Sequence, residues 1–201
     1  MTEKTDAQAT ETEKKAPKVI KLKKTNTQET FKSSRGNEYI FMFTNTQKMQ
    51  QMLDSTYRPD GVHSELLMTV ALLKNVLEGN EYDFDYFDKK IANKDKTEEI
   101  AVEDEEGNQT DYKFKFPGLL AYYQIMENAT GTDGITRESL IYDGLMKDVI
   151  SPKTDWKYWD THAGYAEVMT SAREFVDDVF GNSELAEVMQ AAAGFVNRKF
   201  Q

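Results

Sequence analysis

The feature that most constrains the fold is an internal repeat in the middle of the chain. At a spacing of 73 residues, which falls to 72 near its end, fourteen of about fifty aligned positions are identical. The matched pairs include Tyr39 with Tyr112, Phe41 with Phe114, Phe43 with Phe116, Asp60 with Asp133, Gly61 with Gly134, Asp83 with Asp155 and Tyr86 with Tyr158. A chain with two related segments should form the same succession of elements twice.

Each copy begins with a pattern that predicts a β-hairpin. In the first copy, a turn at residues 34–37 precedes Tyr39, Phe41 and Phe43, so aromatic side chains recur at every second position. The second copy repeats this pattern after an acidic turn at residues 104–108. Because alternate residues share one face of a strand, each aromatic row lies on one face. In the first copy Ile40 and Met42 make the opposite face apolar too, so we expect both faces of that strand to contact protein.

Apolar residues at helical spacing follow each hairpin, and they predict that helices dominate the chain. A further stripe between Tyr165 and Phe180 returns twenty residues later between Leu185 and Phe200, with Ser183 as the expected N-cap of the second helix. The predicted fold class is therefore α+β and mostly helical, with two related hairpin-plus-helices units followed by a C-terminal helical hairpin. The expected boundaries are a disordered tail over 1–18, a first unit over 19–90, a linker or strand over 91–103, a second unit over 104–181 and a C-terminal helix over 182–201.

Composition excludes several classes of function. A net charge of −10 argues against nucleic acid or an anionic membrane as the main partner. The absence of cysteine removes disulfides, thiol catalysis and cysteine-ligated zinc. Because no apolar run reaches the length of a signal or a membrane span, we expect the protein to stay in the cytoplasm.

No residue pattern points to catalysis, to a metal or to a cofactor. His63 and His162 are the two histidines, and neither belongs to a recognisable nucleophile and base arrangement. The acidic clusters at 83–85 and 104–106 lack the ligand spacing of a calcium loop, and there is no glycine-rich phosphate loop. We therefore expect a non-enzymatic protein without cofactors, whose function is binding.

The surface for such binding is expected at the C-terminus. Methionine and aromatic side chains supply adaptable apolar contacts, and two successive amphipathic helices on a short chain favour a partner surface. We hypothesise that this surface binds either a client protein or a second copy of the chain. Its predicted residues are Val168, Met169, Phe175, Val176, Val188, Met189, Phe195 and Val196.

Several short motifs in the second half suggest a family. They are Phe114 to Gly118 with the helix after it, Leu140 to Met146, Val149 to Lys153, Trp156 to Trp159 and the helix from Val168 to Phe180. Over about residues 107–181 the chain resembles the tail assembly chaperones of long-tailed bacteriophages that infect Gram-positive hosts, and those of lactococcal phages in particular. The first half looks like a diverged copy of this segment.

The resemblance implies a non-enzymatic assembly factor that works in the cytoplasm of the infected host and is absent from the mature virion. Members of the family bind the tape measure protein, a long, apolar and largely helical chain, and keep it soluble until the tail tube polymerises around it. Since a chaperone of this kind needs many copies along one long client, we also expect a homo-oligomer. Two other functions stay open from the residues alone: a structural component of the phage tail, and a small acidic regulatory binding protein.

Overall fold

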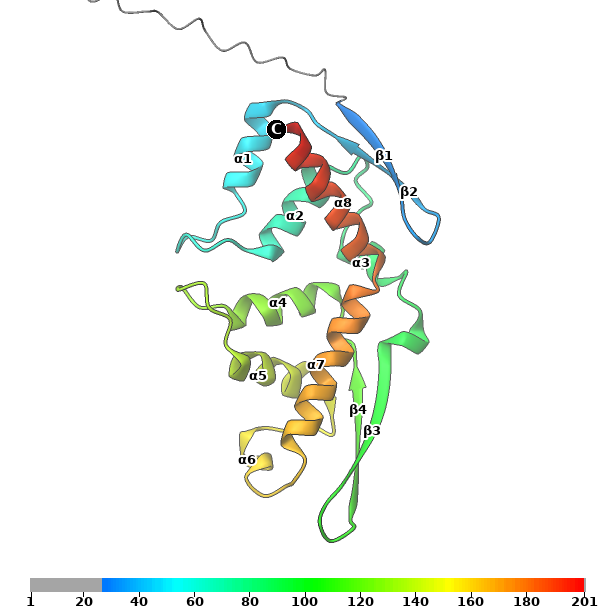
Figure 1. Ribbon diagram of the computed structural model, residues 1–201, viewed down its shortest axis with the longest axis vertical. Coiled ribbons are helices and arrows are strands. Elements are labelled where there is room, and N and C mark those ends of the chain that lie inside the picture. Colours follow the sequence, from blue (N-terminus) through cyan, green and yellow to red (C-terminus); the bar gives the residue numbers. More distant parts are fainter. Residues whose placement is uncertain (1–26, 201) are drawn as a thin grey trace, which may run out of the picture.

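The computed structural model describes residues 27–200 and has the α+β fold that the sequence predicts. Two units of similar make-up follow one another along the long axis of the molecule (Figure 1). The first unit consists of β1 (Gln28–Lys32), β2 (Glu38–Met42), α1 (Thr46–Asp54), α2 (Glu65–Asn75) and α3 (Phe84–Asp88). The second consists of a 3₁₀ helix (Asn93–Lys96), β3 (Thr97–Glu103), β4 (Gln109–Lys115), α4 (Leu119–Ala129), α5 (Glu138–Asp148), β5 (Ile150–Ser151) and α6 (Trp156–Trp159). The tail predicted over residues 1–18 lies outside the described residues.

The predicted repeat is confirmed in local detail. Helices α2 and α5 begin and end 73 residues apart, and α1 and α4 begin at the same spacing. Phe41 of β2 forms an antiparallel bridge with Leu77, and its counterpart Phe114 of β4 pairs with Ile150 of β5. The two segments therefore share their strand pairing as well as their helices.

Both predicted hairpins are present, and each turns its aromatic row inward. Strand β1 pairs antiparallel with β2, and β3 pairs antiparallel with β4. Tyr39, Phe41, Tyr112 and Phe114 are at most 1% exposed. The segment over 91–103, for which a linker or strand is expected, contains β3, and β3 is the first strand of the second hairpin.

The C-terminal helices α7 (Tyr165–Gly181) and α8 (Glu184–Lys199) each pack onto a different unit. The rings of Phe175 in α7 and Phe114 lie 6.0 Å apart, and those of Phe195 in α8 and Phe41 lie 5.7 Å apart. Phe41 and Phe114 are repeat counterparts, so α7 completes the second unit in the way that α8 completes the first. Figure 1 shows α7 beside the second unit and α8 beside the first.

The helical pair is extended rather than folded back on itself. The two helices follow each other along the molecule (Figure 1) because each lies against its own unit. Ser183 is the N-cap of α8, as predicted, and its Oγ accepts a hydrogen bond of 3.3 Å from the amide of Ala186. A short break at Asn182 and Ser183 therefore separates α7 and α8, the two helices of the C-terminal helical pair.

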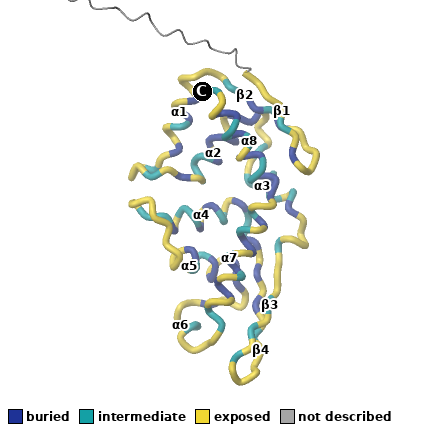
Figure 2. Tube along the Cα trace, in the orientation of Figure 1, coloured by how far each residue is buried: buried dark blue, intermediate teal, exposed yellow. Residues whose placement is uncertain are grey.

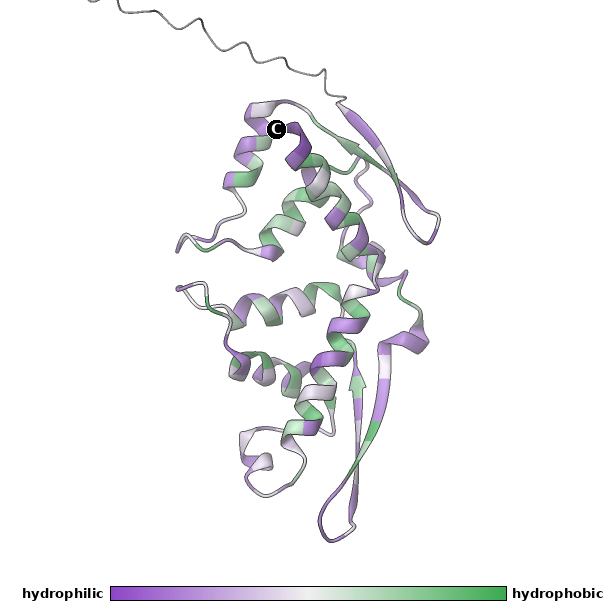
Figure 3. Ribbon diagram, in the orientation of Figure 1, coloured by the Kyte–Doolittle hydropathy of each residue, from purple (hydrophilic) through white to green (hydrophobic). Residues whose placement is uncertain are grey.

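Buried side chains form one connected core that runs through both units. Figure 2 shows the buried residues concentrated along α7, α8 and the strands that face them. Apolar residues occupy the same stretches in Figure 3, whereas the hairpin tips and loops are polar and exposed. The two C-terminal helices thus lie along the length of the molecule and contribute buried residues to the core of both units.

Candidate functional site

The eight residues that were predicted to form a client or self-association surface lie in the core. Their side chains are between 0 and 7% exposed. They are Val168, Met169, Phe175, Val176, Val188, Met189, Phe195 and Val196. We correct the prediction accordingly: the apolar stripes of α7 and α8 face the protein's own strands and helices, and in this arrangement they are not available to a partner.

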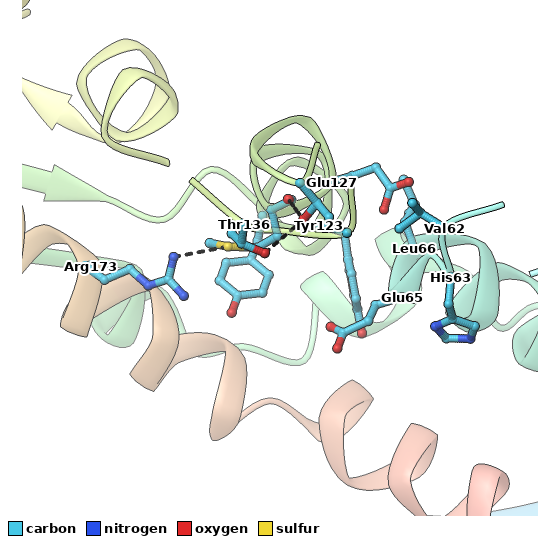
Figure 4. Close-up of a pocket in the computed structure, with 12 residues that line it drawn as sticks. Val62, His63, Glu65, Leu66, Tyr123, Glu127, Thr136 and Arg173 are labelled. Carbon is cyan, nitrogen blue, oxygen red and sulfur yellow. Dashed lines mark hydrogen bonds between the residues drawn. The ribbon is translucent and has the colours of Figure 1, made fainter. Parts of the chain in front are cut away.

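An open cleft lies between the two units, where α2 faces α4. Its volume is about 480 Å³. Figure 4 shows that its side chains come from α2, α4 and α7 and from the loops before α2 and α5. The lining residues are Val62, His63, Glu65, Leu66, Tyr122, Tyr123, Met126, Glu127, Thr130, Gly134, Thr136 and Arg173.

Arg58 holds the two units together beside this cleft. Its Nη1 donates to the carbonyl oxygen of Thr130 (2.9 Å), and its Nη2 donates to that of Gly131 (2.9 Å). The side chain comes from the loop after α1, so it reaches across from the first unit to the end of α4. Asp60 fixes the guanidinium through a contact of 2.6 Å, and this hydrogen bond lowers the pKa of Asp60 below its ordinary value.

Glu127 forms a second link between the units. The Oγ of Ser64 donates to Glu127 Oε2 over 2.8 Å, and the same Oγ accepts from the amide of Leu67 over 3.0 Å as the N-cap of α2. Ser64 is 1% exposed and the Glu127 side chain is 22% exposed, so the link is partly shielded from water. The start of α2 and the end of α4 are therefore held at a fixed separation, which sets the width of the cleft.

On the α7 side of the cleft, a cluster of polar side chains lies next to two stacked aromatic rings. Arg173 contacts Met126 Sδ at 3.1 Å through Nη1 and Asp177 at 2.5 Å through Nε. The hydroxyl of Tyr122 donates to Asp177 over 2.9 Å, and its ring stacks on Phe180 with centroids 4.4 Å apart. Burial raises the pKa of Tyr122, so the phenol stays a neutral donor.

The chemistry of the cleft suits binding. Leu66, Tyr122 and Met126 supply apolar and polarizable contact area, and the carboxylates of Glu65 and Glu127 add negative charge at the mouth. Glu127 and Arg173 are already engaged in structural contacts. The cleft therefore fits an apolar segment that carries polar or cationic side chains.

The two histidines occupy separate surface positions. The ring of His63 meets that of Tyr57 edge-on at 5.4 Å, and the ring of His162 stacks on Tyr158 at 3.8 Å. Within residues 27–200, no group of three or more His, Cys, Asp or Glu side chains is placed to hold a metal ion. Over the same range, no helix combines the length and the apolar character needed to cross a bilayer.

Comparisons with protein-family models, with curated proteins and with solved structures find no significant match for this chain. The cleft between the units, beside which Arg58, Ser64 and Glu127 link the two units, is therefore the feature on which a functional interpretation rests. None of these three residues was singled out from the sequence. Arg58 differs from its repeat counterpart Gly131, and this difference between the copies is the one signal that marks it.

Proposed function

We propose that this protein is a tail assembly chaperone of a long-tailed bacteriophage, which binds the tape measure protein and keeps it soluble before the tail tube forms. In this proposal the protein acts in the host cytoplasm, has no enzymatic activity and does not stay in the mature virion. The sequence resemblance over about residues 107–181 suggests the family. The observation that carries the proposal is the open cleft between the two units.

The composition of the cleft supports a helical client. Methionine and tyrosine side chains adapt to different apolar sequences, as binding sites for amphipathic helices require. Met126, Tyr122 and Leu66 provide such contacts, and Glu65 provides a partner for lysine or arginine on the client. A largely helical client would thus present an apolar stripe to α2 and α4 and its basic residues to the rim.

Co-expression with a tape measure segment of the same phage tests the proposal. We expect wild-type protein to bring the client into the soluble fraction as a complex that size exclusion with light scattering detects. The Val62→Asp variant should lower the yield of complex at least about tenfold, because it places a charge on the apolar wall of the cleft. Circular dichroism would check that the variant is folded.

Ile135 offers a matched control. It is the repeat counterpart of Val62, it lies in the equivalent loop of the second unit, and it is 61% exposed outside the cleft. The Ile135→Asp variant should bind the client like the wild type. A client that stays insoluble beside well-folded protein would reject the chaperone proposal, and finding the protein in purified tails would favour a structural component instead.

A further inference from the structure

The two copies of the repeat differ where the long helix is followed by the short one, at α2 and α3 in the first unit and at α5 and α6 in the second. Asp83 caps α3 and Asp155 caps α6, each through a side-chain oxygen that accepts from a backbone amide of the first turn. The two short helices therefore begin in the same way. Their first residues are a repeat pair of different size, Phe84 in α3 and Trp156 in α6.

In the second unit, Trp156 bridges the short helix and the long one. Its indole N–H donates to the carboxylate of Asp143 in α5, and its ring lies 5.8 Å from that of Tyr165 at the start of α7. The side chain stays 43% exposed, so it lies over the outside of the unit. An indole from the chain itself therefore covers this position in the second unit.

In the first unit, the same bridge is missing. Val70 is the counterpart of the acceptor in α5, and its side chain has no hydrogen-bonding group. The ring of Phe84 lies instead 5.7 Å from that of Tyr123, which belongs to the second unit. The loop before α3 (79–82) is also one residue longer than the loop before α6 (152–154). These differences leave a space between α2 and α3.

That space is a pocket of about 250 Å³ between α2, the loop over 79–82 and α3. Pockets for drug-sized molecules have volumes of roughly 300–1,000 Å³, so this one has room for a single large side chain. Val70 and Phe84 supply apolar walls. Asn80 and Asp83 supply oxygen atoms that can accept a hydrogen bond from an N–H group. The pocket therefore suits an aromatic ring that carries a donor.

The charge around the pocket favours a partner with basic residues. Glu81, Asp83 and Asp85 are exposed in the loop and in the first turn of α3, and Lys74 is exposed in the last turn of α2. Three carboxylates against one ammonium group attract lysine or arginine beside the aromatic residue.

We propose that this pocket binds a tryptophan side chain of a partner protein, in a segment that carries lysine or arginine next to the tryptophan. The indole would lie between Val70 and Phe84 and donate to Asn80 or Asp83, so that it covers the first unit as Trp156 covers the second. Trp156 itself is held by its own chain, so a different protein must supply the ring. The proposal follows from the comparison of the two copies and does not depend on the chaperone proposal.

Titration of isotope-labelled protein with N-acetyltryptophanamide tests the site by NMR. We expect saturable shift changes at the backbone amides of Val70, Asn80 and Phe84, with a Kd on the order of 1 mM, because a single side chain makes few contacts. A Lys-Trp-Lys peptide blocked at both ends should bind about three- to tenfold more tightly, through the carboxylates at the rim. N-acetylalaninamide, which lacks the ring, should give no saturable change at these amides.

Exchanging residues between the copies gives matched variants. Val70→Asp combined with Phe84→Trp rebuilds the bridge of the second unit in the first, so the protein's own indole should fill the pocket and weaken probe binding at least about tenfold. Asp143→Val combined with Trp156→Phe removes the bridge from the second unit and should add a second set of saturable shifts near α6. Ile135→Asp, which is remote from both positions, should bind the probe like the wild type.

A single substitution keeps the test decisive if a double variant does not fold. Val70 is 41% exposed, so Val70→Phe should be tolerated while its ring fills the pocket and abolishes probe binding. Circular dichroism would check that each variant is folded. Wild-type protein without saturable changes at the pocket amides, or a folded Val70→Phe variant that binds the probe as tightly as the wild type, would overturn the proposal.

Discussion

At the scale of single residues, Glu184 is the most consequential polar side chain of the core. It is 1% exposed at the start of α8, and it accepts hydrogen bonds from the Oγ of Ser33 and from Asn37 Nδ2 (2.7 Å). Lys90 Nζ adds an ion pair at 3.2 Å. This carboxylate therefore joins the turn of the first hairpin, the segment after α3 and the last helix of the chain.

The contribution of Glu184 should depend on pH. Burial alone would raise its pKa, but hydrogen bonds from Ser33, Asn37 and Lys90 outweigh burial and hold the pKa below the ordinary value of 4.5. A carboxyl whose pKa is lower in the folded state stabilises the fold above its unfolded pKa, and this stabilisation is lost as the pH falls through the folded pKa.

We predict that Glu184→Gln lowers the free energy of unfolding by about 2 kcal/mol at neutral pH, because buried hydrogen bonds to a charged group are lost. The gap between variant and wild type should narrow as the pH falls below 4.5. Urea unfolding at several pH values measures both quantities. Glu187→Gln, in the same turn of α8, is the control, because its hydrogen bonds to Ser34 are exposed. A gap that is constant with pH would contradict this account.

At the scale of elements, α7 and α8 perform equivalent tasks in the two units. Phe175 and Phe195 are 5% and 0% exposed, and each packs against the inward aromatic of its own hairpin. Each of these helices is thus part of the unit that it packs against, although α7 and α8 both follow the two units in the sequence. Truncating either one would leave a strand face open to water.

We expect Phe175→Ala and Phe195→Ala each to lower the free energy of unfolding by about 3–5 kcal/mol, the usual cost of removing a buried phenylalanine ring. Thermal or urea denaturation followed by circular dichroism gives the values. Tyr57→Ala serves as a control, since that side chain is 53% exposed and should change stability by less than about 0.5 kcal/mol. If Phe195→Ala had a negligible effect on stability, α8 would not contribute to the core of the first unit.

The helices and strands themselves were largely predictable from the sequence, whereas the segments that each of them packs against were not. Alternating aromatics and helical stripes are local patterns, so the hairpins, the repeat and the cap at Ser183 could be recognised in the sequence. An apolar stripe has the same spacing whether it faces its own chain or a client, so the burial of Val168 and Phe195 could not be predicted from the sequence. The pairing of α8 with β2 and the cleft beside Arg58 arise from contacts between distant segments, which a local pattern does not encode.

At the scale of the whole molecule, coupling between the two units is open to measurement. Both tryptophans, Trp156 and Trp159, belong to α6 in the second unit. Tryptophan fluorescence therefore reports on the second unit, whereas circular dichroism reports on the helices of both. Arg58 reaches from one unit to the other. Its removal should therefore affect whether fluorescence and circular dichroism report the same unfolding transition.

We predict that the two probes give one common urea transition in the wild type, and that Arg58→Ala lowers its midpoint and separates the two signals. The reason is that the variant leaves the carbonyl groups at the end of α4 without their donor from the first unit. Arg137→Ala is the matched control, because Arg137 pairs with Asp133 inside the second unit. If Arg58→Ala left the transitions together at the wild-type midpoint, the proposed role of this residue in coupling would be wrong.

The place of α8 beside the first hairpin also determines the order in which the protein can be completed during synthesis. Arg198 near the end of α8 contacts Glu29 of β1 at 2.7 Å, across 169 positions of sequence. Once α7 has left the ribosome, every element of the second unit has been made. The first unit still lacks α8, which covers one side of its core. The half of the protein that is translated first is therefore the half that finishes folding last.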